Sequence, residues 1–250
     1  IFHIDLNTAN FREKDSLYSV LNDYLTGWEE KYGARESEAT LALRFKGVIA
    51  RAAEKEGRGV VILIDEYDKP ILQTLRDPEL QAEHRAQLKA FYSVLKTQDR
   101  YIKFAFLTGV TKFGKISVFS DLNLIDISMD YRYVNICGTT EEELKSYFKD
   151  GISELASANG NFEDLRRNGY KYVDKTNFVY KLADEGKYYF LSRPRRFGKS
   201  LFLSTLEAYF QGKKELFKGL AIYDLETEWK KYPIFHIDLN TANFREKDSL

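Results

Sequence analysis

The sequence contains very few of the residues that build disulfides and transition-metal sites: one Cys, one Met and three His among 250 residues. A single cysteine excludes a disulfide within the chain, and one Cys with three scattered His excludes a zinc site of the usual spacing. Cys137 is therefore expected to be a small buried side chain at a strand end. His84 is expected on the surface, and His3 and His236 are one position counted twice, without an obvious partner.

The chain also lacks an excess of charge and any long apolar run. Lys plus Arg and Asp plus Glu both number 38, so overall charge does not indicate a nucleic-acid or membrane partner. No apolar stretch approaches the length that spans a bilayer, and the start has no signal-peptide pattern. We therefore expect a cytoplasmic protein, and 44% hydrophobic content allows one sizeable core.

The two ends of the chain are identical. Residues 1–17 read IFHIDLNTANFREKDSL, and residues 234–250 repeat them without a change. Old duplications diverge, so the identity of the two ends indicates a circularly permuted order. In such an order the usual two ends of the sequence are joined, and the chain begins and ends at another point. A deliberately permuted protein, a reading frame across circular or tandem DNA, and a fragment of a tandem array all fit. The lack of an initiator Met favours a reading frame without its own start.

Short β-rich runs separated by longer helical patterns predict parallel βαβ units. The expected fold is α/β, a parallel sheet flanked by helices on both faces. The expected strands are Ile1–Leu6 or its copy Ile234–Leu239, Val60–Ile64, Ile102–Thr108, Tyr133–Cys137 and Lys187–Leu191. The expected helices are about 16–31, 41–56, 79–96, 140–156, 176–184, 200–211 and 224–231.

We expect residues 1–250 to form one domain in rotated order. Residues 1–158 would hold the acidic strand and the strand beside it, 159–161 the junction, and 162–250 the phosphate-loop part with the repeated edge strand. Only one copy of IFHIDL fits beside Val60–Ile64. The surplus copy would fray, add at the same edge, or exchange with a second molecule, which makes self-association a candidate property.

A phosphate-binding loop is expected at Arg193–Ser200, which reads RPRRFGKS between a strand and an apolar helix. Gly198 would let the backbone approach an anion, and the helix that begins near Lys199 would direct its unpaired N–H groups toward it. Arg193 stands where the usual pattern has its first glycine. The expected nucleotide-binding residues are Arg195, Arg196, Phe197, Gly198, Lys199, Ser200 and Leu201. The two arginines Arg195 and Arg196 either clamp phosphates or face solvent.

An acidic strand end, Asp65 and Glu66 after Val60–Ile64, completes the expected site. Asp65 is predicted to hold Mg²⁺, directly or through water, together with the Ser200 hydroxyl, while Lys199 contacts the β- and γ-phosphates of ATP. Glu66 is predicted to polarise the attacking water, the alternative being an acidic cap of the next turn. Thr108 would orient that water or sense the γ-phosphate, or is an ordinary strand-end hydroxyl.

At these residues the chain resembles a predicted AAA-ATPase-like family of bacteria. The resemblance rests on the RPRRFGKS loop, on YVDKT at Tyr172–Thr176, on LIDEYDKP at Leu63–Pro70 and on FLTGVTKFGKISVFSDLN at Phe106–Asn123. It implies a P-loop NTPase fold of the ASCE type with strand order 5-1-4-3-2, ATP and Mg²⁺ as ligands, and adenine contacts near Tyr172–Thr176. Members usually continue into a restriction-endonuclease-like nuclease domain; no segment here resembles it, so no nuclease activity is implied.

Three functions follow as hypotheses. The first is an ATP-binding protein with Mg²⁺-dependent hydrolysis. The second is a nucleotide-gated interaction module with little turnover, which Arg193 and the loop 122–128, one residue shorter than in relatives, support. The third is nucleic-acid binding through Arg193, Arg195, Arg196, Lys112 and Lys115, against which the neutral net charge counts. Lys112, Lys115 and Arg132 are otherwise solvated or contact a neighbouring subunit's nucleotide.

Overall fold

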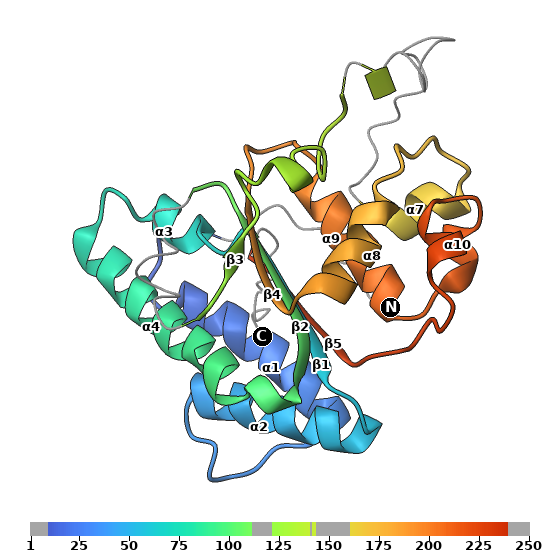
Figure 1. The fold of residues 1–250 in the computed structure, drawn as a ribbon. Coiled ribbons are helices and arrows are strands. Elements are labelled where there is room, and N and C mark those ends of the chain that lie inside the picture. Colours follow the sequence, from blue (N-terminus) through green and yellow to red (C-terminus); the bar gives the residue numbers. More distant parts are fainter. Residues whose placement is uncertain (1–9, 112–121, 141, 144–160, 240–250) are drawn as a thin grey trace, which may run out of the picture.

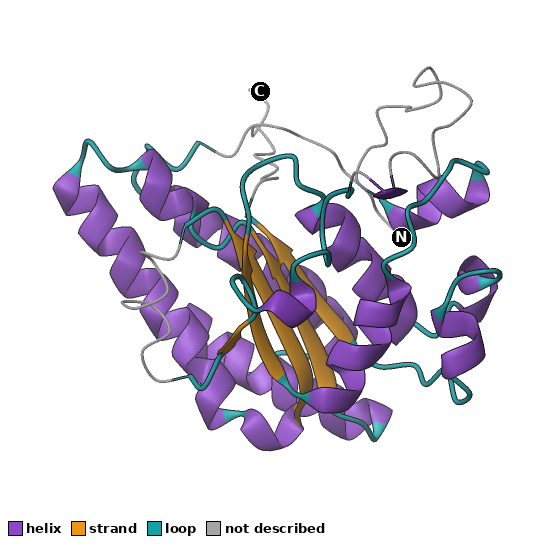
Figure 2. Ribbon diagram, turned by 45° about the horizontal axis from the view of Figure 1, so that its top comes forward, coloured by secondary structure: helices purple, strands orange, loops and turns teal. Residues whose placement is uncertain are grey.

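The sheet is parallel and carries helices on both faces (Figures 1 and 2), as the sequence predicts. The computed structural model describes residues 10–111, 122–140, 142–143 and 161–239. Its five strands are β1 (Val60–Asp65), β2 (Ile102–Gly109), β3 (Ile125–Asp126), β4 (Tyr188–Ser192) and β5 (Ile234–Asp238). None of the helices in these ranges is long and apolar enough to cross a membrane.

The strand order is β3-β4-β2-β1-β5, and each neighbouring pair is parallel. The order along the chain therefore differs from the predicted 5-1-4-3-2, and it would correspond to it only if the strands were numbered in the proposed permuted order, from β4, the strand before the phosphate loop. In particular β2 lies between β4 and β1, so the loop strand and the acidic strand are not direct neighbours. The sheet also differs from the prediction in its edge strand beside β4, which is β3 and not the segment Tyr133–Cys137.

The prediction of a strand at Tyr133–Cys137 is wrong. A short 3₁₀ turn, η2 (Tyr131–Tyr133), occupies its start, because the Asp130 carboxylate accepts a hydrogen bond from the Arg132 backbone N–H at 2.9 Å. The edge position beside β4 belongs to β3 instead, and Ile127 N donates to Phe190 O just beyond it. Cys137 is nevertheless buried, as expected, and burial raises the pKa of its thiol to about 12.

Two groups of helices cover the sheet. One face carries α1 (Ser16–Tyr32), α2 (Leu41–Glu56) and α4 (Pro78–Thr97), and the other carries α7 (Phe162–Arg167), α8 (Thr176–Glu185), α9 (Lys199–Phe210) and α10 (Ile222–Leu225) (Figure 1). The short elements α3 (Lys69–Gln73), η1 (Asp99–Tyr101) and η4 (Lys214–Phe217) complete the described set. The predicted helices at 16–31, 41–56, 79–96, 176–184 and 200–211 are confirmed to within a residue or two at each end.

Local hydrogen bonds explain where helices start and stop. The Thr40 hydroxyl accepts the Leu43 N–H at 3.2 Å at the start of α2, and Gly57, with φ 62°, ends the same helix. Thr140 and Glu143 form a capping box, since Thr140 N donates to Glu143 Oε2 at 2.8 Å and Glu143 N donates to Thr140 Oγ1 at 3.1 Å. Most of the predicted helix 140–156 lies outside the described residues.

The prediction of a helix at 224–231 is wrong. Only α10 forms there, and it ends at Leu225. The Glu226 carboxylate accepts the Glu228 N–H at 2.8 Å, its carbonyl accepts Trp229 Nε1–H at 2.9 Å, and Trp229 itself has φ 44°. These local bonds turn the chain toward β5 instead of continuing the helix.

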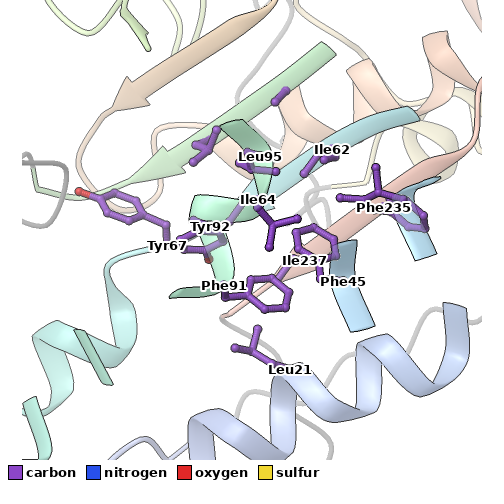
Figure 3. Close-up of a cluster of buried hydrophobic side chains, with 14 of the residues drawn as sticks. Leu21, Phe45, Ile62, Ile64, Tyr67, Phe91, Tyr92, Leu95, Phe235 and Ile237 are labelled. Atoms are coloured by element: carbon purple, nitrogen blue, oxygen red, sulfur yellow. The ribbon is translucent and has the colours of Figure 1, made fainter. Parts of the chain in front are cut away.

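Aromatic and aliphatic side chains fill the space between the sheet and α1, α2 and α4. Phe45 of α2 stacks on Phe91 of α4 with ring centroids 4.3 Å apart, and Phe235 of β5 packs beside them (Figure 3). A second cluster on the opposite face joins Phe104 and Phe106 of β2 to α9. Burial on both faces explains why the β1 sequence is apolar throughout.

The 234–250 copy of the repeat supplies the edge strand. Ile234 to Asp238 pair in parallel register with Val61 to Asp65, and Leu239 N donates to Asp65 O at 3.2 Å. The helix that packs against this strand, α1, begins at Ser16 in the other copy, and the Tyr24 hydroxyl hydrogen-bonds Asp238 O at 3.0 Å. The described sheet thus combines the strand of one copy with the helix that follows the other. Residues 1–9 and 240–250 lie outside the described residues.

Both histidines in the described ranges have partners that the sequence did not reveal. The prediction that His84 is on the surface is wrong, because its side chain is fully buried and its Nε2 lies 2.9 Å from Phe11 O. His236 Nδ1 lies 2.9 Å from Glu207 Oε2 of α9. Burial lowers the pKa of His236, but the hydrogen bond and the charge of Glu207 outweigh it, so this pKa is raised above its ordinary value.

Matched substitutions in the two copies test which one forms the edge strand. Phe235→Ala should lower the free energy of unfolding by about 3–5 kcal/mol, because the ring is fully buried, whereas Phe2→Ala should change it little. Chemical denaturation of both variants measures the difference. Equal losses would contradict the assignment of β5, and small losses in both, with a large loss only in the double variant, would show that the copies interchange.

The His236–Glu207 contact should make stability depend on pH. Because the folded-state pKa of His236 is raised, its contribution should be complete below about pH 6.5 and should be lost as pH rises through the folded value. His236→Asn should flatten this part of the stability profile, and His3→Asn should leave it unchanged. Denaturation series between pH 5 and pH 9 would reveal the slope; an identical slope in His236→Asn would refute the contact.

Candidate functional site

A tight turn carries the chain from the end of β4 into α9. Gly198, with φ 80°, is the N-cap of α9, and its carbonyl accepts the Phe202 N–H at 3.0 Å. Arg196 also has a left-handed backbone, with φ 65°, which costs a non-glycine residue on the order of 1–2 kcal/mol. Such a turn leaves the first N–H groups of a twelve-residue helix directed at the space in front of it.

Arg193 ties this turn to the rest of the sheet edge. Its guanidinium donates to the carbonyl of Ser128, in the loop after β3, and to the carbonyl of Ser192 at 3.2 Å. Its backbone N–H donates to Gly109 O at 3.2 Å. The residue in place of the usual glycine therefore holds the loop against its two neighbours, and its side chain is already engaged with backbone carbonyls.

The carboxylate of Asp65 meets the first turn of α9. Ser200 Oγ donates to Asp65 Oδ2 at 2.5 Å, and the Thr108 hydroxyl donates to Asp65 Oδ1. Asp65 is 2% exposed and Thr108 is fully buried, so the contact between these two residues is shielded from water, whereas Ser200 is exposed. Three strand or helix ends, those of β1, β2 and α9, thus meet at one carboxylate.

Glu66 and Lys199 form a buried ion pair beside that carboxylate. Lys199 Nζ lies 3.0 Å from Glu66 Oε1, and the two side chains are 3% and 11% exposed. Lys199 Nζ also donates to the carbonyls of Arg193 at 3.2 Å and Pro194 at 3.3 Å. Glu66 has φ 51°, a strained backbone, and its N–H donates to Asp65 Oδ1 at 3.1 Å.

The remaining predicted phosphate-loop residues lie around this centre. Arg195, Arg196 and Phe197 are exposed, the last by 48%. Leu201 is partly buried and packs against the core under α9. The structure therefore brings Asp65, Glu66, Thr108, Lys199 and Ser200 together and leaves the two arginines at the rim.

Oxygen donors at this centre fit Mg²⁺ better than a soft metal. Asp65 Oδ2 and Ser200 Oγ lie side by side, and Mg²⁺ prefers a carboxylate and hydroxyl supplemented by water and phosphate oxygens. Within the described ranges no group of three or more His, Cys, Asp or Glu is placed to hold a metal ion. A magnesium ion here would therefore depend on the nucleotide for much of its coordination.

Sequence reasoning missed a second role of the segment after Glu66. Asp68 is the N-cap residue of α3, but its buried carboxylate makes no capping bond. It accepts instead the N–H of Val110 at 3.1 Å and the N–H of Thr111 at 2.7 Å. The Tyr67 hydroxyl donates to Thr111 O at 2.9 Å. We call this set of bonds the Asp68 clamp; it fixes the acidic loop to the end of β2. In the sequence, the only sign of the clamp is a third acidic residue shortly after Asp65 and Glu66.

The segment Tyr172–Thr176 lies against α9 and α10. The Tyr172 hydroxyl lies 3.4 Å from Thr205 Oγ1, and the Asp174 carboxylate accepts the N–H groups of Thr176 and Ala221. Lys175 forms an ion pair with Glu143. These bonds position the segment, and adenine contact there stays a prediction.

Other predicted contact residues lie apart from these bonds or outside the described ranges. Arg132 pairs with Asp130, with 2.6 Å between Nη2 and Oδ2. Lys112 and Lys115 lie outside the described residues, so their predicted contacts stay untested.

The tight approach of Gly109 to the Asp68 clamp gives a direct test of it. A Cβ at this position would lie 2.4 Å from Tyr67 Cε1 and 2.9 Å from Asp68 Oδ1. Gly109→Ala should therefore destabilise the protein by about 1–3 kcal/mol through overpacking. Gly27→Ala, inside α1 with nothing within 4 Å of the new Cβ, should be neutral or stabilising by up to about 1 kcal/mol. Thermal and urea denaturation measure both; a neutral Gly109→Ala would contradict the described packing.

Comparisons with known proteins agree with this architecture. The profile of a family described as "Predicted AAA-ATPase" matches residues 1–119 and 157–250. A protein of Azotobacter chroococcum mcd 1, described as "Uncharacterized protein in vnfD 5'region", is 40% identical over 176 residues. That alignment covers 69% of this chain but 33% of the relative, so the chain spans about a third of that relative's length. No solved structure matches the chain. Because the family profile covers most of the sequence, the chain belongs to the predicted AAA-ATPase family.

Proposed function

We propose that this protein binds ATP with Mg²⁺ at the junction of β1, β2 and α9 and hydrolyses it. The observation that carries this proposal is the meeting of Ser200 with Asp65 at 2.5 Å, although 135 positions separate them along the chain. A hydroxyl at a helix N-terminus beside a strand-end carboxylate is the donor pair that phosphate-bound Mg²⁺ requires. The fold and the family membership support the same assignment.

Each residue of the centre has a distinct role in the proposal. The N–H groups at the start of α9 and the Lys199 ammonium bind the β- and γ-phosphates. Asp65 and Ser200 hold Mg²⁺, which would neutralise charge on the phosphates when bound. Thr108 acts as a positioning residue, since its buried hydroxyl donates to Asp65 and fixes the orientation of that carboxylate.

Glu66 is the proposed base for the attacking water. Its carboxylate is paired with Lys199 at 3.0 Å. A triphosphate would compete for the Lys199 ammonium, and Glu66 would then be released to accept a proton from water. Nucleotide binding would thus be coupled to activation of Glu66, because Lys199 cannot pair fully with both Glu66 and the phosphates.

Glu66→Gln should separate binding from hydrolysis. The amide cannot accept the proton of water, so the hydrolysis rate should fall about 10²–10⁴-fold while ATP affinity stays within a few-fold of wild type. Phosphate release and equilibrium titration with a fluorescent ATP analogue measure the two quantities. Glu36→Gln, on an exposed loop, is the matched control and should change neither. Unchanged hydrolysis in Glu66→Gln would remove Glu66 from the mechanism.

The second candidate function is a nucleotide-gated interaction module with little turnover. The pairing of Glu66 with Lys199 favours it, because a base that stays neutralised cannot activate water. Single-turnover hydrolysis compared with equilibrium ATP binding separates the two functions. Tight ATP binding by the wild type, with hydrolysis as slow as in Glu66→Gln, would support the module over the enzyme.

A further inference from the structure

The proposed base, Glu66, has a backbone conformation that a glutamate does not adopt readily. Its φ of 51° is left-handed, a region that is uncommon for residues other than glycine, asparagine and aspartate. Its own N–H donates to Asp65 Oδ1 at 3.1 Å, which is a bond within the turn itself. Such a conformation persists only where the surrounding structure holds it. The direction in which the Glu66 carboxylate points therefore depends on what holds the residues that follow it.

The loop that follows the acidic strand is bonded to the end of β2. Tyr67 N donates to Thr108 O at 3.0 Å, and the Tyr67 hydroxyl donates to Thr111 O at 2.9 Å. The Asp68 carboxylate, 1% exposed, accepts the N–H of Val110 at 3.1 Å and the N–H of Thr111 at 2.7 Å. The Thr111 hydroxyl donates to the same Asp68 oxygen, Oδ2, at 2.8 Å. The acidic loop is thus fixed to β2 and to the residues just beyond it.

The same residues at the end of β2 are also bonded to the phosphate loop. Gly109 O accepts the N–H of Arg193 at 3.2 Å, and Val110 O accepts the Ser192 hydroxyl at 2.9 Å. Because β2 lies between β1 and β4, its carboxyl end lies between the ends of the strands from which the two loops leave. We call residues 109–111 the bridging segment. It joins the acidic loop to the phosphate loop through hydrogen bonds to both.

The Asp68 side chain serves this bridge and not the helix that it precedes. Asp68 is the N-cap residue of α3, yet its side chain accepts no bond from the first turn of that helix. The described hydrogen bonds of its carboxylate come from the bridging segment. A carboxylate binds N–H groups more strongly than a neutral acceptor does, and its removal would leave the N–H groups of Val110 and Thr111 without that acceptor. Loss of Asp68 should therefore loosen the acidic loop from the bridging segment more than it disturbs α3.

We propose that Asp68 is a positioning residue for ATP hydrolysis, which holds Glu66 in place against the phosphate loop by way of the bridging segment. The inference rests on the proposed function. Glu66 and Lys199 lie on the two joined loops with Oε1 and Nζ 3.0 Å apart, so a shift of the acidic loop moves the base relative to the phosphates that Lys199 binds. A displacement of about 1 Å can lower a rate about 100-fold when reacting groups must be aligned. In this role Asp68 neither accepts a proton from water nor binds phosphate.

Asp68→Ala should slow hydrolysis and spare binding. The rate of hydrolysis of bound ATP should fall about 10- to 100-fold, whereas the ATP dissociation constant should stay within about threefold of wild type, because the phosphate contacts of Lys199 and α9 remain. Single-turnover phosphate release and equilibrium titration with a fluorescent ATP analogue measure the two quantities. Asp77→Ala is the matched control. It removes the acid at the start of α4, where Asp77 accepts the Leu80 N–H at 3.0 Å, and should change neither quantity.

A double-mutant cycle with Glu66 shows whether Asp68 acts through the base. In a Glu66→Gln background the base is already lost, so the addition of Asp68→Ala should lower the remaining rate by less than about twofold. A merely structural loss would instead lower the rate by the same factor in both backgrounds. The cycle therefore separates alignment of the base from a general weakening of the fold.

Two substitutions at Thr111 decide the question if Asp68→Ala does not fold. Thr111→Val removes only the hydroxyl that donates to Asp68 and keeps the backbone N–H bond. It should lower the hydrolysis rate about three- to tenfold, again only while Glu66 is present, and Thr111→Ser should restore the wild-type rate. Circular dichroism and thermal unfolding establish that each variant is folded.

The results that overturn this inference differ from those that overturn the proposed function. Wild-type protein that binds no ATP, or that binds ATP without hydrolysing it, would refute both. Wild-type protein that hydrolyses ATP, with an unchanged rate in Asp68→Ala and Thr111→Val, would leave the proposed site intact and make Asp68 a structural residue of the acidic loop. An equal loss of rate with and without Glu66 would lead to the same conclusion.

Discussion

The hydrogen bond between Ser200 and Asp65 is the contact on which the site depends. It joins the first turn of α9 to the end of β1, and Thr108 of β2, the strand between β1 and β4, completes it by donating to the other carboxylate oxygen. Parallel strands make this possible because their carboxyl ends share one edge of the sheet. Strand order, burial of β1 on both faces and the turn into α9 all serve to bring these oxygens together.

Two residues with strained backbones lie at the same edge of the sheet. Glu66 and Arg196 have left-handed backbones, with φ 51° and 65°, and they lie on the two loops that carry the lysine and the carboxylates. A residue keeps such an unfavourable backbone conformation only when hydrogen bonds and packing around it hold the backbone in place. The Asp68 clamp holds the acidic loop on β2, and Arg193 holds the phosphate loop on the segment after β3. The acidic loop and the phosphate loop therefore meet at the ion pair between Glu66 and Lys199.

Short sequence motifs predicted the features that depend on residues close together in the chain. Val60–Ile64 followed by two acids, and Gly198-Lys199-Ser200 between a strand and an apolar helix, located both halves of the centre. The strand at Tyr133–Cys137 was wrong because Asp130 starts a tight turn there, and apolar residues that pack under α8 resemble a strand in their spacing. His84 looked like a polar helix surface, yet it packs against Phe11, far away in sequence.

The features that could not be predicted from the sequence depend on pairing between distant segments. The Asp68 clamp, the register of Asp65 with Asp238 and the choice between identical copies of the edge strand all depend on contacts between distant segments. Because the two copies have the same sequence, they have the same strand propensity, which cannot decide which copy enters the sheet. Only the continuity of each copy with its neighbouring helix separates them, and that energy difference is about a kcal/mol by loop-closure arguments.

A crystal structure with Mg²⁺ and a non-hydrolysable ATP analogue tests the central claim most directly. We expect the triphosphate in front of the first turn of α9, the metal bound through Ser200 and Asp65, and Lys199 moved from Glu66 to a phosphate oxygen. A nucleotide bound elsewhere, or a bound nucleotide that leaves the Lys199–Glu66 pair intact and the metal away from Ser200, would contradict it.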